Sequence, residues 1–160
     1  MLLKLFAILR IAMGWTFFWA FFDKLYGLGF ATPKEGAWLN GGSPTFSFLN
    51  FATKGPFSEF FQSLAGAMWV DWFFMTALLL MGTALILGIG VKLASWGGAL
   101  LLVIMYIAGF MPPEHNPFLD EHLLNTLILL GLPLANAGDI WGFGRWWSST
   151  SLVQKFTILK

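Results

Sequence analysis

The chain has 160 residues, of which 58% are hydrophobic and only 11% are charged, and it contains nine Trp and 18 Phe. A soluble domain of this size could not bury so much apolar surface, so the composition excludes an ordinary soluble protein and predicts one membrane-embedded domain, residues 1–160. The net charge of +1 argues against a nucleic-acid partner, and the absence of cysteine excludes disulfides, iron–sulfur clusters and c-type haem attachment.

The first hydrophobic segment, residues 3–27, carries ionisable side chains at membrane depth. Arg10 lies well inside it, and Asp23 and Lys24 lie together near its far end. Ionisable groups in a span are costly, so they normally face the interior of a bundle and mark a functional site. Lys24 follows Arg10 by fourteen positions, or about four helical turns, which places both cations on one face. Alternatively, each cation extends separately to the lipid headgroups.

Three more segments have the length and apolarity of spans, at about residues 70–90, 93–111 and 121–138. The last is short and contains Pro133. The bias of basic residues in the loops and tails sets the orientation. With both termini in the cytoplasm, the inner side holds Lys4, Lys92, Arg145, Lys155 and Lys160, and the outer side holds Lys24, Lys34 and Lys54. We therefore expect an all-α, four-helix membrane bundle, with residues 3–27 a retained span and not a cleaved signal peptide.

A long external loop, about residues 30–69, is rich in phenylalanine, which is unlike a flexible linker. It contains a turn sequence, NGGSP, at residues 40–44. Residues 58–68 then place apolar side chains at helical spacing, which predicts a short amphipathic helix at the outer membrane face.

Several of these segments resemble a known family. The pattern R-x₃-G-W-x-F-F-x-A-x₃-K-L, from Arg10 to Leu25, resembles the DoxX/DoxD family of small four-span membrane proteins, and so do residues 27–45, 51–66, 116–122 and 135–147. The resemblance implies a four-helix bundle in the plasma membrane of a prokaryote. DoxD proteins are known as a subunit of thiosulfate:quinone oxidoreductase, and other DoxX-type proteins are associated with different membrane oxidoreductases. Many members carry an acid early in the second span, where this chain has Asp71 at the very start.

The first span supplies candidate binding residues. Arg10 and Lys24 could bind a small sulfur oxyanion or a quinone oxygen, because both are strong donors to oxygen. Asp23 could accept a proton during quinone chemistry, or it could form a local ion pair with Lys24. Trp15 and Trp19 could form flat walls for a quinone ring, or they could simply pack against lipid or core.

Polar residues near the start of the fourth span are candidates for proton transfer. Glu121 and His122 are expected at the outer mouth of the bundle, beside Asp23 and Lys24, and the alternative is a helix cap with a polar rim. Glu114, His115 and Asp120 are also nearby in sequence. No metal site is expected, because no E-x-x-H pair occurs and adjacent helical residues point about 100° apart.

The leading hypothesis is a membrane subunit of a quinone-linked oxidoreductase, of the type that converts thiosulfate to tetrathionate and passes electrons to membrane quinone. Asp23, Glu121 and His122 would be catalytic, Arg10 and Lys24 would bind substrate, and Trp15 and Trp19 would bind the quinone. The alternative is a non-catalytic membrane anchor for a soluble redox partner. The expected partners are the lipid bilayer, a quinone, a sulfur oxyanion, and a second subunit or a second copy of the chain, with no metal, haem or iron–sulfur cofactor.

Overall fold

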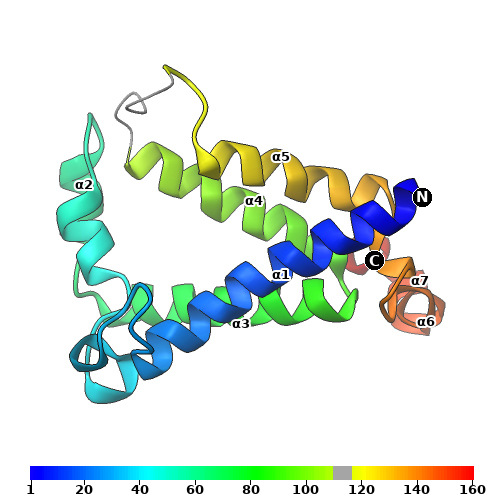
Figure 1. Ribbon diagram of the computed structural model, residues 1–160, viewed down its shortest axis with the longest axis horizontal. Helices are drawn as coiled ribbons and strands as arrows, with labels where there is room; N and C mark the ends of the chain where they lie inside the picture. Colours follow the sequence, from blue (N-terminus) through cyan, green and yellow to red (C-terminus); the bar gives the residue numbers. More distant parts are fainter. Residues whose placement is uncertain (110–116) are drawn as a thin grey trace.

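The computed structural model describes residues 1–109 and 117–160, and the regular elements within these ranges are all helical (Figure 1). Three helices are long and apolar enough to cross a membrane: α1 (Leu2–Tyr26), α3 (Met68–Leu87) and α4 (Val91–Ala108). Their boundaries lie close to the predicted ones. The prediction of an all-helical membrane protein is therefore confirmed for the first three spans.

The fourth predicted span is helix α5 (Glu121–Leu134), which is apolar but has only 14 residues. Its rise of ~21 Å is less than the ~30 Å of a hydrocarbon core. The helix ends soon after Pro133, and Asn136 has a left-handed backbone (φ 48°), which cannot continue it. The expected continuation to residue 138 is therefore wrong for the helix itself, because residues 137–139 form a separate turn of 3₁₀ helix, η4 (Ala137–Asp139).

The four longest helices associate as two pairs, in which α1 packs mainly against α3 and α4 packs mainly against α5. Figure 1 shows α1 crossing α3, with α4 and α5 running side by side. Two glycines allow the helix backbones of α1 and α3 to touch. A Cβ atom at Gly82 would lie 2.6 Å from the Phe18 backbone nitrogen, and one at Gly14 would lie 2.8 Å from the Ile86 nitrogen. Such close crossings are typical of helices in lipid.

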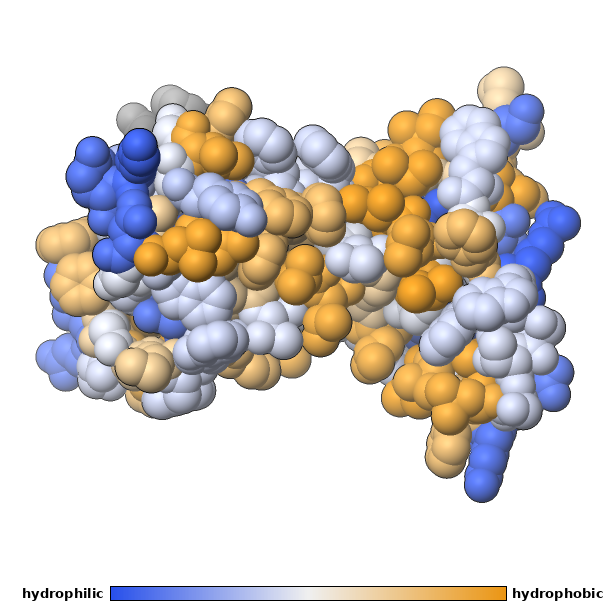
Figure 2. Space-filling model, turned by 90° about the horizontal axis from the view of Figure 1, so that it is seen from below, coloured by the Kyte–Doolittle hydropathy of each residue, from blue (hydrophilic) through white to orange (hydrophobic). Residues whose placement is uncertain are grey.

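The buried side of these helices is apolar, with Phe17, Met75, Leu85 and Leu129 among the core residues. Figure 2 shows hydrophilic residues gathered at the two ends of the long axis and mostly apolar residues between them. This distribution suits a protein that crosses a bilayer along that axis.

One end of the molecule, which we call the loop end, is formed by residues 27–67. This segment contains short helical turns and one α-helix: η1 (Lys34–Gly36), η2 (Trp38–Asn40), η3 (Phe48–Ala52) and α2 (Ser58–Ser63). The short helix predicted here is present, although it ends at Ser63, before Gly66 with its positive φ of 81°. In Figure 1, α2 lies across the directions of the long helices. The Lys54 amide donates to the Ala108 carbonyl at 2.9 Å, which ties the loop to the last turn of α4.

The opposite end, which we call the tail end, holds the start of α1 and residues 135–160 (Figure 1). After η4, the chain forms α6 (Gly144–Ser149), α7 (Ser151–Lys155) and η5 (Thr157–Leu159). Two hydrogen bonds fix this tail: the Lys92 amide donates to the Lys160 carbonyl at 2.9 Å, and Trp147 Nε1 donates to the Leu159 carbonyl at 2.6 Å. The tail is thus folded back onto the first turn of α4.

Candidate functional site

Arg10 is completely buried, with 0% of its surface exposed, and its guanidinium is surrounded by backbone carbonyl groups. Nε donates to Ala137 at 3.0 Å, Nη1 donates to Leu85 and to Ile86, and Nη2 donates to Ile140 at 3.2 Å and to Trp141 at 2.9 Å. A guanidinium has five N–H donors, so each has an acceptor. We call these five carbonyls and the guanidinium the Arg10 socket.

The Arg10 socket forms because two chain segments contain carbonyl groups that do not accept hydrogen bonds within a helix. Leu85 and Ile86 lie in the last turn of α3, where carbonyls lack intrahelical partners and carry the negative end of the helix dipole. Ile140 and Trp141 lie in an irregular segment, and Trp141 has a positive φ of 52°, which is rare for a non-glycine residue. The charge of Arg10 is thus stabilised by peptide dipoles contributed by the end of α3 and by the tail.

Glycines line the Arg10 socket at positions where a side chain would not fit. A Cβ atom at Gly88 or at Gly142 would lie 3.0 Å from a guanidinium nitrogen, and one at Gly138 would lie 2.6 Å from the Gly88 carbonyl oxygen. The backbone can therefore close around the guanidinium. A ligand could reach Arg10 only by displacing carbonyl groups that are already bonded to it.

Asp23 is also buried, and its carboxylate binds the start of the external loop. Its two oxygens accept hydrogen bonds from the amides of Phe30, at 3.1 Å, and Ala31, at 3.0 Å. The Asp23 carbonyl oxygen accepts the amide of Gly27 at 2.8 Å, which ends α1. Asp23 therefore holds the turn that follows α1.

Asp71 plays the corresponding part at the start of α3. Its Oδ1 accepts from the Ser43 hydroxyl at 2.9 Å, the Thr45 amide at 3.2 Å and the Thr45 hydroxyl at 2.6 Å. Asp71 is 6% exposed. The NGGSP turn is thus anchored to the second span by a buried carboxylate.

Asp120 and His122 form a side-chain ion pair, the one found among the described residues, with 2.6 Å between Oδ2 and Nδ1. Asp120 also caps α5, because its Oδ1 accepts the amide of Leu123 at 2.9 Å. Burial acts most strongly on the pKa of Asp120 and raises it, but the Leu123 amide and the hydrogen bond and charge of His122 together outweigh burial. The pKa of Asp120 therefore lies below its ordinary value. Because an ionised carboxylate only accepts, Nδ1 carries the shared proton.

Within the described residues, no hydrogen bond or ion pair joins Asp23 or Lys24 to Glu121 or His122, so the predicted cluster is not assembled. Asp23 binds only loop amides, His122 binds Asp120, and Glu121 is exposed. Figure 1 shows the corresponding ends of α1 and α5 far apart. Lys24 is half-buried, and neither a hydrogen bond nor an ion pair of its side chain occurs within residues 1–109 and 117–160. Glu114 and His115 lie outside the described residues.

The two tryptophans proposed to hold a quinone ring lie on the outer surface of α1. Trp15 is 53% exposed and stacks on Trp19, with 5.7 Å between ring centroids. Trp19 in turn contacts the edge of Phe30 at 5.1 Å. The pair therefore presents a flat aromatic surface toward the lipid and not toward the bundle interior.

Within the described parts of the chain, no three His, Asp or Glu side chains are grouped closely enough to hold a metal ion. The carboxylates that are buried, Asp23 and Asp71, are each bonded to loop donors. Asp120, Glu121 and His122 are proton-carrying groups that lie close together in sequence and are not buried.

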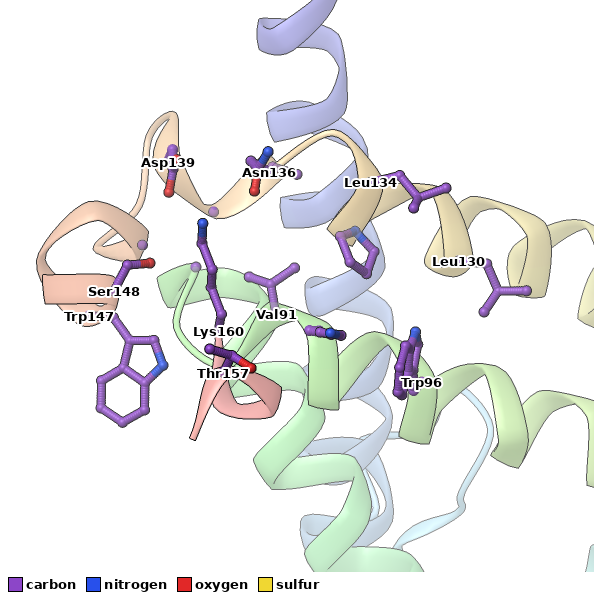
Figure 3. Close-up of a pocket in the computed structure, with 16 residues that line it drawn as sticks. Val91, Trp96, Leu130, Leu134, Asn136, Asp139, Trp147, Ser148, Thr157 and Lys160 are labelled. Carbon is purple, nitrogen blue, oxygen red and sulfur yellow. The ribbon is translucent and has the colours of Figure 1, made fainter. Parts of the chain in front are cut away.

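A cavity of about 430 Å³ lies at the tail end, between the start of α4, the end of α5 and the folded tail. Figure 3 shows Lys160 rising in its middle, with Asn136 and Asp139 on one side and Trp96 and Trp147 across from each other. Lys92 also lines this cavity, with its Nζ 5.1 Å from the centre of the Trp96 ring. We call it the tail cavity.

A second hollow of about 670 Å³ runs between α3 and α4 on the outer surface of the bundle. Its lining is almost entirely apolar, and small residues such as Ala77, Ala84 and Gly97 create the space. We call it the α3–α4 groove. Trp147 lines both this groove and the tail cavity, so the two hollows are adjacent.

Comparison with protein-family models, curated proteins and solved structures finds no match for the chain. Membership of the DoxX/DoxD family therefore stays a prediction. The function has to be inferred from the chain's own residues.

The sequence did not reveal what Arg10 and Asp71 bind, nor the tail cavity. One signal was available for the Arg10 socket: four glycines, Gly88, Gly138, Gly142 and Gly144, follow the ends of α3 and α5. For Asp71 the signal was the pair of hydroxyl residues in the preceding turn. The tail cavity depends on how residues 144–160 fold back, which no local pattern specifies.

Proposed function

We propose that the protein is a membrane subunit of a quinone-linked oxidoreductase, and that its role is to anchor a redox partner at the plasma membrane of a prokaryote. The apolar helices α1, α3 and α4 support the membrane location. The resemblance of the sequence to the DoxX/DoxD family supports the redox setting. We further propose that α5 completes a four-span bundle, and that both termini are cytoplasmic.

The observation that favours an anchor over a catalyst is that the deepest polar side chains hold the fold together. All five donors of Arg10 are bonded to carbonyls, and the carboxylates of Asp23 and Asp71 are bonded to loop amides and hydroxyls. Groups committed in this way fix the loop end and the tail end relative to the spans. Two such ordered ends give a partner rigid surfaces on which to dock.

A second candidate is direct catalysis, in which thiosulfate is oxidised at the loop end and a quinone is reduced beside α1. Two observations favour it. Lys24 keeps an ammonium group without a hydrogen-bonded partner among the described residues, and such a group can attract an oxyanion. The Asp120–His122 pair could pass protons, and Trp15 and Trp19 form a surface on which a quinone ring could stack.

The test compares variants in membranes from cells that lack the chain. Membranes are supplied with the wild type, Lys24→Gln or His122→Gln, and thiosulfate-dependent reduction of a soluble quinone analogue is measured. For an anchor, both variants restore the rate as fully as the wild type, because neither residue holds the fold. The purified chain alone is then expected to show no turnover.

Other outcomes would assign the function differently. Turnover by the purified chain, lost in Lys24→Gln or His122→Gln while the melting temperature is unchanged, would overturn the anchor and establish catalysis. If removal of the chain leaves the membrane activity unaltered, the link to thiosulfate and quinone is refuted altogether.

A further inference from the structure

The tail cavity has a mostly apolar lining with several polar and charged side chains, and it lies at the end of the molecule where the spans would meet the lipid headgroups. Its ionisable side chains are two ammonium groups, Lys92 and Lys160, and one carboxylate, Asp139. Two tryptophans, Trp96 and Trp147, stand at its sides (Figure 3). Tryptophans beside lysines are typical of the interface between hydrocarbon and water.

The charge around the tail cavity favours an anionic ligand. Lys4, Arg145 and Lys155 are three further exposed cations of the tail end. Asp139 carries the only acidic side chain in residues 1–20, 86–109 and 135–160. Basic pockets between helices at the membrane surface suit phosphate-bearing headgroups. Lysine donates well to phosphate as a point charge.

The α3–α4 groove supplies the second half of a site for an amphiphile. It starts at Trp147, Gly90 and Leu159, beside the tail cavity, and continues along α3 and α4 toward Phe73 and Ile104. Thr76 is its main polar side chain, so the groove suits a hydrocarbon chain. A ligand with a charged headgroup and a hydrocarbon chain could therefore occupy the tail cavity and the α3–α4 groove at once.

We propose that the tail cavity and the α3–α4 groove together form a specific site for one anionic phospholipid, with its phosphate between Lys92 and Lys160 and an acyl chain along α3 and α4. The lipid would fill the space between the folded tail and the spans. A free phosphate ion could bind the same lysines but has no acyl chain to fill the groove. Occupation of the α3–α4 groove therefore distinguishes a phospholipid from free phosphate. The proposal does not depend on the redox function.

The experiment titrates delipidated protein in detergent with phosphatidylglycerol, with phosphatidylcholine of the same acyl chains, and with inorganic phosphate. Binding is measured by native mass spectrometry for the lipids and by calorimetry for all three. Phosphatidylglycerol is expected to bind most tightly, because the choline headgroup carries a compensating positive charge. Each lysine near an anionic headgroup contributes roughly a fivefold change in affinity, so Lys92→Gln or Lys160→Gln should weaken binding by about that factor.

Matched variants distinguish the contribution of the lipid headgroup to binding from that of the acyl chain. Lys92→Arg keeps the charge and should keep the affinity, whereas Lys4→Gln removes a cation of the same end that does not line the cavity and should have no effect. Gly97→Leu should fill the groove and weaken phosphatidylglycerol binding while leaving the weak binding of phosphate unchanged. A Cβ atom at Gly97 makes only an ordinary contact, with Met81 Sδ at 3.5 Å, so the backbone itself leaves room for a side chain at this position. Ala12→Leu, on the exposed face of α1, is the control for added bulk.

Three results would overturn the proposal. The first is equal affinity for phosphatidylglycerol and phosphatidylcholine. The second is an affinity for phosphatidylglycerol that neither lysine variant changes while both variants keep the wild-type melting temperature in lipid-free detergent. The third is that inorganic phosphate binds as tightly as phosphatidylglycerol and that Gly97→Leu does not change the affinity for phosphatidylglycerol.

Discussion

A guanidinium surrounded by five carbonyl oxygens needs no carboxylate partner. Arg10 lies at a depth where an isolated charge is costly, but peptide dipoles of α3 and of residues 137–141 point toward it. Arginine suits this position because its donors are spread over a rigid fork, whereas lysine has three donors on a single nitrogen. Arg10 therefore holds α1, α3 and the tail together through its hydrogen bonds.

Arg10→Lys is expected to lower stability by roughly 2 kcal/mol or more, because at least two buried carbonyls lose their donor and each costs about 1–3 kcal/mol. Thermal unfolding in detergent measures the effect, and limited proteolysis should show new cleavage near residues 137–141. Arg145→Lys, on the exposed part of α6, is the control and should change neither. An unchanged melting temperature in Arg10→Lys would show that the charge alone matters, as in anion binding.

The Asp120 cap should give α5 a pH-dependent contribution to stability. Because the pKa of Asp120 is below its ordinary value of about 3.9, the stabilisation is complete above that value and is lost as the pH falls through the lowered pKa. Melting temperatures measured from about pH 6 to about pH 3 should fall more steeply for the wild type than for Asp120→Asn, whose amide still caps the helix. Parallel pH profiles for the two proteins would contradict this assignment.

At the scale of elements, two glycines decide how closely α1 and α3 cross. The contact at Gly82 involves backbone atoms of Phe18, which cannot move aside as a side chain could. Added bulk at this point must therefore separate the helices.

Gly82→Ala should thus destabilise the protein by about 1–3 kcal/mol, the usual cost of overpacking, even though alanine is the better helix former. Gly97→Ala is the matched control on α4. Its Cβ atom would make only an ordinary contact with Met81, so the higher helix propensity should leave stability unchanged or slightly raised. Equal melting temperatures for the two variants would refute the close crossing of α1 and α3.

The elements that the sequence predicted well are those with a one-dimensional signal. Long apolar runs specified α1, α3 and α4, and apolar periodicity specified α2. The predicted end of α5 was wrong because Ala135 and Ala137 favour a helix, whereas Asn136 between them adopts a left-handed conformation. The burial of Arg10 also agrees with the expectation that an ionisable residue inside a span faces the interior.

The candidate site was harder to predict, because it depends on distances between elements. Spacing on one helix could not show that residues 137–141 close over Arg10, nor that the ends of α1 and α5 diverge at the loop end. The residues predicted to do chemistry were the ionisable side chains of the first span together with Glu121 and His122. In the structure, Arg10, Asp23 and Asp71 form hydrogen bonds with backbone or hydroxyl groups of the same chain. Lys24 and the Asp120–His122 pair are the groups that could still take part in a reaction.

For the whole molecule, single-cysteine labelling tests the topology, since the chain has no cysteine of its own. Ser63→Cys, Glu121→Cys and Ser149→Cys each place a thiol at an exposed position. A membrane-impermeant maleimide added to intact cells should label residues 63 and 121, and it should label residue 149 only after permeabilisation. Labelling of 121 and 149 from the same side would show that α5 does not span, and labelling of 149 alone would reverse the orientation.

The Arg10 socket also imposes an order on biosynthesis. The ribosome delivers Arg10 to the membrane while the residues that supply three of its five acceptors, 127 or more positions later, have not yet been translated. Until then the first span carries an incompletely satisfied cation, which is best accommodated inside the insertion machinery or near the headgroups. Closure of the tail over Arg10 is consequently a late event, and quality-control proteases have a window in which to recognise chains that never complete it.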